Sequence, residues 1–181
     1  MLVNAAAGGA GSLLVQLLHA LGAKVIGAAR GVRKLALVSE LGADVVVDYS
    51  EPGWTDQVRA AAGRAGVSVV LDGAGGDLGE QAFEAIASGG RFITYGSSGG
   101  EFAEIDTHRA AQRDVKVTGL LDLPPLDPAV RRSLVEQALT ELASGRIGPV
   151  IGQTFPLERA AEAHAAIAAR ATLGKTLLEI S

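Results

Sequence analysis

The sequence predicts an α/β fold built on a doubly wound parallel sheet of six strands, with helices on both faces. Two observations lead to this prediction. Apolar runs of strand length alternate with segments whose apolar residues recur at helical spacing, and glycines or acidic residues mark the boundaries. Six such runs precede the proline-rich stretch at 124–125, so the helices between them must cover both faces of one sheet.

The strands and helices follow one another in regular order. Strands are expected at the apolar runs 1–6, 24–29, 44–49, 67–72, 89–96 and 114–121. The helices between them are expected to bury stripes formed by Leu14, Leu17, Leu18 and Leu21, by Leu35, Val38 and Leu41, by Trp54, Val58 and Ala62, and by Leu78, Ala82, Phe83 and Ile86. Glycines at the ends of the first two stripes stop those helices.

The segment 97–113, between the last two strands, is predicted to be a long loop and a natural rim for a ligand crevice. Asp127 and Pro128 then cap and begin a helix that ends at Gly145. Its inner face is expected to be formed by Val130, Leu134, Ala138 and Leu142.

The segment after about residue 147 does not continue this alternation of sheet strands and helices. A short strand is expected near 150–155, an alanine-rich helix begun by Pro156 follows, and a last strand is expected at 175–180. We therefore divide the chain into a domain of residues 1–146 and a C-terminal segment of residues 147–181.

Composition narrows the classes of function. The 181 residues carry a net charge of -4, with 48% hydrophobic and 20% charged residues, which is typical of a globular domain. Nucleic acid is not an expected partner, because no general basic field is present. The sequence contains no cysteine, which excludes disulfides and thiolate metal sites within it and suits a reducing compartment. No apolar run reaches the roughly 18 residues of a membrane span, so we expect a cytoplasmic protein without a membrane partner.

The stretch Ala6–Gly11 reads A-A-G-G-A-G, which is the G-x-G-x-x-G pattern of a Rossmann fold with alanine in the first glycine position. A purely structural turn is the alternative, but the pattern follows a predicted strand and opens a helix, the context that favours dinucleotide binding. Gly8 would let the backbone approach a pyrophosphate, and Gly11 would let the helix pack closely on the strand. The helix N-terminus would offer its N–H groups to the anion. The six-stranded sheet is therefore predicted to be Rossmann-like.

The residues after the second strand indicate which dinucleotide is bound. An NAD site would carry an acidic residue about 20 residues beyond the glycines, but Ala29 stands there, followed by Arg30, Arg33 and Lys34. These cations could simply decorate a solvated helix start. However, cations oppose the dipole at a helix N-terminus, whereas guanidinium and ammonium groups suit a 2′-phosphate. NADP(H) is therefore favoured over NAD(H).

Five stretches spread over the chain carry a family resemblance: "VNAAAGGAGSLLVQLLHALGAKVIGAAR", "KLALVSELGADVVVDY", "VVLDGAGG", "GGRFITYGSSGG" and "FPLERAAEAHAAIAARATLGKTLLEI". Together they resemble the cofactor-binding half of the medium-chain dehydrogenase/reductase superfamily, specifically its zinc-independent quinone oxidoreductase branch. The alanine in the first glycine position, the double glycine and the terminal R-A-T-x-G-K segment are the most specific features.

The resemblance implies a set of cofactor contacts. Gly8, Gly9, Ala10 and Gly11, with Ala6 in place of the leading glycine, would lie at the pyrophosphate, and Arg30 and Lys34 at the adenosine 2′-phosphate. Tyr49 matches a family tyrosine near the adenosine, although a half-buried aromatic at a strand end would look the same. Residues from Asp72 to Gly75 would lie beside the adenine and ribose, and Gly96, Ser97 and Ser98 would back the nicotinamide. The implied reaction is hydride transfer from NADPH to a quinone or an activated alkene.

Family members carry a barrel-like domain ahead of this sheet, and Met1 already stands at the first strand. We therefore expect the substrate domain to be missing, whether through truncation, a misplaced start or fragmentation. Apolar residues that would meet that domain, Phe155, Leu177, Leu178 and Ile180, are then expected to be exposed or repacked. The resemblance also implies a homodimer that pairs through the sixth strand near 116–121.

No catalytic residue can be assigned from the sequence. His19, His108 and His164 share no metal-ligand spacing, so no metal is expected, and no G-x-S-x-G motif surrounds a serine. Three hypotheses of function stay open. The chain is part of an NADPH-dependent quinone or enone reductase, a non-catalytic NADP(H)-binding module, or the enoyl-reductase segment of a larger synthase.

Overall fold

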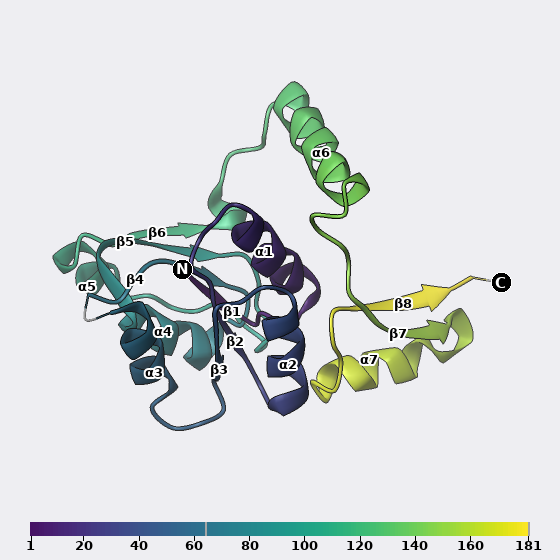
Figure 1. Cartoon of the computed structure of the whole chain (residues 1–181), viewed down its shortest axis with the longest axis horizontal. Coiled ribbons are helices and arrows are strands. Elements are labelled where there is room, and N and C mark those ends of the chain that lie inside the picture. Colours follow the sequence, from purple (N-terminus) through teal and green to yellow (C-terminus); the bar gives the residue numbers. More distant parts are fainter. Residues whose placement is uncertain (64, 181) are drawn as a thin grey trace.

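The computed structural model describes residues 1–63 and 65–180, and its centre is a six-stranded parallel sheet (Figure 1). The strand order is β3-β2-β1-β4-β5-β6, so the chain runs outward from β1 to one edge and then returns to build the other half. The strands are β1 (Leu2–Asn4), β2 (Ile26–Ala29), β3 (Val45–Asp48), β4 (Val67–Asp72), β5 (Ile86–Thr94) and β6 (Lys116–Gly119). The predicted Rossmann-like sheet is confirmed.

Helices cover both faces of this sheet, and each face has its own core. One core contains residues of α1 (Gly9–Ala20) and α2 (Val32–Glu40). The other contains residues of α3 (Trp54–Ala62), α4 (Gly76–Glu84) and α5 (Thr107–Gln112).

Alternation along the strands sends neighbouring residues to opposite cores. On β1, Leu2 belongs to the core under α3 and α4, and Val3 belongs to the core under α1 and α2. Burying a side chain of this size contributes roughly 1.5–3 kcal/mol. The apolar runs of the sequence form strands because both faces of each strand are covered.

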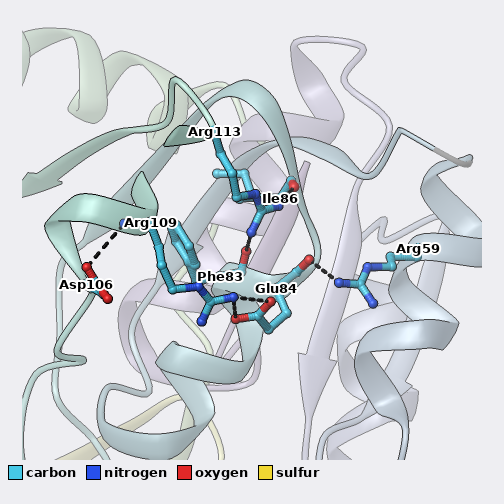
Figure 2. A network of polar contacts seen from close by, with 7 residues as sticks. All are labelled: Arg59, Phe83, Glu84, Ile86, Asp106, Arg109 and Arg113. Carbon is cyan, nitrogen blue, oxygen red and sulfur yellow. Dashed lines mark hydrogen bonds and ion pairs between the residues drawn. The ribbon is translucent and has the colours of Figure 1, made fainter. Parts of the chain in front are cut away.

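Arginine side chains fix the C-terminal end of α4, where backbone carbonyls have no partner within the helix (Figure 2). Arg113 donates to the carbonyl of Phe83 at 3.3 Å and stacks over its ring, and Arg59 donates to the carbonyl of Glu84. Arg109 pairs with the Glu84 carboxylate at 2.7 Å. These contacts tie α3, α4 and α5 together at the end of the sheet opposite the carboxyl ends of the strands.

Several predicted boundaries were wrong. Ile86 does not belong to the α4 stripe, because it is the first residue of β5 and pairs with Val67 of β4. The segment predicted as a loop at 97–113 contains α5, whose N-terminal N–H groups are capped by the Asp106 carboxylate. Leu21 lies just past the end of α1 and is 73% exposed, although it was predicted to be buried.

The predicted inner face of the helix that begins at Pro128 was also wrong. This helix, α6 (Pro128–Ala143), stands apart from the sheet (Figure 1), and none of its residues is buried. Val130, Leu134, Ala138 and Leu142 are all exposed. Between β6 and α6 lies a short 3-10 turn, η1 (Leu120–Asp122).

The C-terminal residues form a small unit of their own. A two-stranded parallel sheet of β7 (Ile151–Pro156) and β8 (Lys175–Glu179) packs with α7 (Ala160–Ala168). Pro156 ends β7 and precedes the 3-10 turn η2 (Leu157–Arg159), so it does not begin the helix as predicted. Leu177, Leu178 and Ile180 are exposed, as expected, and Phe155 is half-buried.

Within residues 1–63 and 65–180, every helix is too short or too polar to cross a bilayer.

Candidate functional site

A cleft of about 380 Å³ opens at the carboxyl ends of the central strands. Its walls come from the turn after β1, from the ends of β2 and β3, from the loops after β4 and β5, and from the C-terminal unit. The lining residues are Ala5, Ala7, Gly8, Gly9, Ala10, Gly11, Ala29, Lys34, Tyr49, Gly73, Leu78, Tyr95, Gly96, Ser97, Ser98, Gly99, Ile167, Arg170 and Thr172. Strands β1 and β4 are the point where the strand order reverses, and open α/β sheets bind ligands at this point.

The turn after β1 brings the start of α1 to the cleft. Ala5 adopts a positive φ of 58°, and a Cβ atom on Gly11 would clash with the Ala5 carbonyl oxygen and lie 2.9 Å from the Cα of Ala6. The helix can therefore approach the strand only because Gly11 has no side chain. Within the described chain, no side chain caps this end of α1. Its first N–H groups face the cleft and are suited to an anion.

Ala6 lies behind this turn. It is fully buried, and its N–H group donates to the carbonyl of Ala28 at 2.9 Å. Gly8, Gly9, Ala10 and Gly11, which the sequence places at a pyrophosphate, line the cleft, whereas Ala6 does not line it and holds the turn against β2.

Positive charge gathers at one end of the cleft. The Lys34 ammonium donates to the backbone carbonyl of Arg170 at 2.7 Å, and both residues line the cleft. Burial lowers the pKa of Lys34 below its ordinary value of 10.5, and the charges of Arg30 and Arg170 lower it further. Arg30 itself is exposed and does not line the cleft, but its charge reaches Lys34.

Tyr49 lies beside these cations. It lines the cleft at the end of β3, and its ring meets Trp54 edge to face with the ring centroids 6.4 Å apart. Burial raises its pKa, while Arg30 and Arg170 act in the opposite direction. Its ring is thus fixed between the core and the positively charged end of the cleft.

The C-terminal unit closes one side of the cleft. The N–H of Gly174 donates to the carbonyl of Ala7 at 2.8 Å, next to a parallel bridge between Gly8 and Gly174. The Gln16 amide exchanges two hydrogen bonds with the backbone of Gly148, at 2.9 and 2.8 Å. The Gly174 contacts place the segment after α7 against the turn after β1, and the Gln16 contacts join α1 to the residues that precede β7.

Sequence reasoning missed the residues that this unit contributes, which are Ile167, Arg170 and Thr172. The R-A-T-x-G-K segment was the available signal, but it served only to indicate a family. Nothing in the local pattern says that this segment reaches a turn more than a hundred residues earlier.

The loops after β4 and β5 form the opposite wall. Gly96, Ser97 and Ser98, which the resemblance places behind a nicotinamide, line the cleft. The N–H of Ser98 donates to the carbonyl of Gly73 at 3.1 Å, and the N–H of Gly99 donates to the carbonyl of Ala74 at 2.6 Å. The two loops therefore form one hydrogen-bonded wall.

Two residues predicted from the resemblance to contact a cofactor lie behind that wall. Asp72 is fully buried, and its carboxylate accepts hydrogen bonds from the N–H groups of Ala74 and Gly75 and from the Asn4 side chain. Gly75 is buried at the start of α4, where a Cβ atom would clash with the Glu101 carbonyl oxygen. Neither residue lines the cleft, because both serve the packing of the loop.

Tyr95 is the remaining polar side chain that the sequence did not single out for this site. Its hydroxyl donates to the Asn4 carbonyl at 3.2 Å, and burial raises its pKa, with a further contribution from the Asp72 charge. It stays protonated at neutral pH, and its proton already has an acceptor.

A family model described as zinc-binding dehydrogenase matches residues 41–178. The chain belongs to this family. It is 34% identical over 184 residues to quinone oxidoreductase-like protein 2 of Bos taurus, a match that covers 99% of this chain and 52% of the relative. The chain spans about half the length of the curated relatives it matches.

Solved structures of the family share the fold. The quinone oxidoreductase of Escherichia coli complexed with NADPH aligns with a TM-score of 0.86 and 30% identity, over 99% of this chain and 56% of that one. An NAD-dependent alcohol dehydrogenase aligns with the same TM-score and 32% identity, over 99% of this chain and 50% of that one. The fold is therefore common to relatives of both cofactor types, and the choice of dinucleotide must depend on side chains.

The residues at hand do not fit a zinc ion, despite the family's description. The sequence has no cysteine, and within residues 1–63 and 65–180 no three His, Asp or Glu side chains converge on one point. Zinc in proteins is held by three or four such ligands. No step of chemistry in these 181 residues is therefore assigned to zinc.

Proposed function

We propose that this chain is the NADP(H)-binding part of an oxidoreductase that transfers hydride from NADPH to a quinone or an activated alkene. One observation carries the choice of cofactor. Lys34 and Arg170 meet at the cleft end next to Ala29, where a site for NAD would have an acidic side chain for the ribose hydroxyls.

An acidic residue beside Arg30 does not replace the missing one. Asp48, at the end of β3, accepts hydrogen bonds from the N–H of Gly31 at 2.7 Å and from Ser50. These bonds, together with the charge of Arg30, lower its pKa against the effect of partial burial. The Asp48 carboxylate is engaged by these donors and Asp48 does not line the cleft, so it does not offer a free acceptor to ribose hydroxyls.

The remaining walls suit the rest of a dinucleotide. The start of α1 at Gly9–Gly11 would bind the pyrophosphate through its N–H groups. Lys34 and Arg170, supported by Arg30 and Tyr49, would bind the 2′-phosphate and the adenosine. The wall that contains Gly96, Ser97 and Ser98 would then lie at the nicotinamide end.

A bound NADPH would supply the hydride, and the protein would orient the nicotinamide and exclude water on one side of it. Among the residues that line the cleft, the Tyr95 hydroxyl is committed to the Asn4 carbonyl, so we assign no general acid to this chain. We propose that residues 1–146 hold the nucleotide and that residues 147–181 complete its 2′-phosphate pocket. Two chains would pair through the free edge of β6.

A fluorescence titration of the 181-residue chain tests this proposal. NADPH should bind at least about tenfold more tightly than NADH, because charge-assisted hydrogen bonds to a phosphate contribute roughly 1.5–3 kcal/mol. The variant Lys34→Met should remove most of this preference. Arg132→Met, which deletes an exposed cation on α6, is the matched control and should keep it. Equal affinities of the unaltered chain for NADPH and NADH would reject the proposal.

A further inference from the structure

Asn4 and Asp72 lie side by side at the carboxyl ends of β1 and β4, directly opposite each other in the parallel register. Both are fully buried, and the Asn4 amide donates to the Asp72 carboxylate at 2.9 Å. This pair stands where the strand order of the sheet reverses, directly behind the cleft.

From Asp72, a series of hydrogen bonds reaches the cleft wall. Its carboxylate accepts from the N–H of Ala74 at 3.1 Å and from the N–H of Gly75 at 3.2 Å. The carbonyls of Gly73 and Ala74 in turn accept from the N–H groups of the wall after β5. The side chain of Asp72 thus fixes a loop whose outer face holds residues that line the cleft.

Asn4 makes matching contacts on the other side. Its side-chain oxygen accepts from the N–H of Ala5 at 3.2 Å, at the residue whose positive φ starts the turn after β1. Its amide also donates to the carbonyl of Leu78 at 3.2 Å, and its backbone carbonyl accepts from the Tyr95 hydroxyl. The pair therefore contacts all three chain segments that leave β1, β4 and β5.

The burial of this carboxylate is costly unless its hydrogen bonds are complete. Among the described residues, every hydrogen bond that Asp72 accepts comes from a neutral N–H donor, and no cation pairs with it. Its second oxygen also approaches α4 closely, since a Cβ atom on Gly79 would lie 2.6 Å from it. A buried network of this kind fixes one arrangement of its loops when all members are satisfied.

We infer that Asp72, held by Asn4, is a positioning residue that sets the spacing between the turn after β1 and the wall after β5, and so controls binding of the nicotinamide half of the cofactor. Asp72 does not touch the ligand in this arrangement. The inference rests on the proposed NADP(H) site, in which the cationic end takes the adenosine half.

The variant Asp72→Asn tests this inference. An amide in place of the carboxylate loses one acceptor and turns a donor toward the Gly75 N–H. The Kd for NADPH should rise about tenfold, the effect of losing one hydrogen bond to a charged group. The Kd for adenosine 2′,5′-bisphosphate, which carries only the adenosine half, should stay unchanged. Equal weakening of both ligands, or of neither, would overturn the inference.

Amide hydrogen exchange in the ligand-free chain provides a readout that does not depend on binding. In Asp72→Asn the amides of Ala74, Gly75, Ser98 and Gly99 should exchange faster, while those of β2 and β3 should not. Unchanged rates at these four amides would overturn the positioning role. A different pair of results would reject the proposed function, and with it the assigned ligand. In that case Asp72→Asn speeds exchange at these amides, but the unaltered chain does not bind NADPH.

Two further variants separate positioning from loss of stability. Ile86→Val lowers stability at the other end of β5 without touching the pair, and it should leave both dissociation constants unchanged. Asn4→Ser removes the amide contact with Asp72. It is the alternative test of the inference if Asp72→Asn does not fold. It should reproduce the selective loss of NADPH binding, and an equal loss for both ligands would count against the inference.

Discussion

The Lys34 ammonium donates to the backbone carbonyl of Arg170 at 2.7 Å, although the two residues are 136 positions apart. Lys34 belongs to the first turn of α2, and Arg170 follows α7 in the C-terminal unit, where it adopts a positive φ of 55°. The contact brings the Arg170 guanidinium close enough to lower the pKa of Lys34. The two halves of the chain therefore build the positively charged end of the cleft together.

We predict that Arg170→Ala weakens NADPH binding by about tenfold or more, since a hydrogen bond to a charged group contributes roughly 1.5–3 kcal/mol. The variant removes the guanidinium but keeps the carbonyl that Lys34 contacts. Binding of NADH should change little, because NADH has no 2′-phosphate. Fluorescence titration measures both constants. A parallel loss for NADH would place Arg170 elsewhere on the ligand.

The pH dependence of binding should report Lys34. Its pKa is lowered from the ordinary value of 10.5 by burial and by the charges of Arg30 and Arg170. Its ammonium therefore loses its proton at a lower pH than that of an ordinary lysine. A bound phosphate favours the charged form. NADPH affinity should therefore fall as the pH rises through this lowered pKa.

Titrations between about pH 7 and about pH 10 check this sign. In Lys34→Arg the guanidinium keeps its charge throughout, so the affinity should become nearly independent of pH in that range. The same fall in Lys34→Arg as in the unaltered chain would assign the pH dependence to another group.

Gly11→Ala should destabilise the turn after β1. A Cβ atom at this position has no space against the Ala5 carbonyl and the backbone of Ala6, so α1 must move away from β1. We expect the free energy of unfolding to fall by about 1–3 kcal/mol, measured by urea denaturation. Gly148→Ala is the matched control, because no atom lies within 4 Å of its added Cβ atom. Equal stability of the two variants would contradict the close packing described for Gly11.

Self-association should depend on the free edge of β6. This strand ends the sheet, and Val117 on it is 41% exposed, so a second copy can add to the edge. Light scattering should give twice the chain mass for the unaltered chain and the single mass for Val117→Lys. Val130→Lys makes the same change on the exposed α6 and should stay dimeric. A monomeric unaltered chain would remove the proposed dimer.

Local patterns predicted most of the sheet, because strands that are covered on both faces must be apolar along their whole length. The runs at 24–29, 44–49 and 67–72 all contain strands of the central sheet. The wrong predictions lie where packing is absent or remote. Leu134 on α6 follows helical spacing but is exposed, and α5 is too short to show a clear stripe.

The predicted site residues show the same contrast between local and remote signals. Gly8, Gly11 and Lys34 belong to short motifs with a local reason for each residue, and all three line the cleft. Asp72 belongs to the strand end that precedes the cleft wall, and its position in sequence gave no indication that its side chain turns inward to Asn4.

The sequence by itself determined the alternation of strands and helices, the glycine turn and the presence of cations after the second strand, because these depend on spacing within about 20 residues. Tertiary structure alone decided that Arg170 joins Lys34, that Asp72 lies behind the cleft, and that α6 remains uncovered. Such contacts join positions far apart in the chain. Their geometry depends on how whole elements pack, which no local pattern of residues encodes.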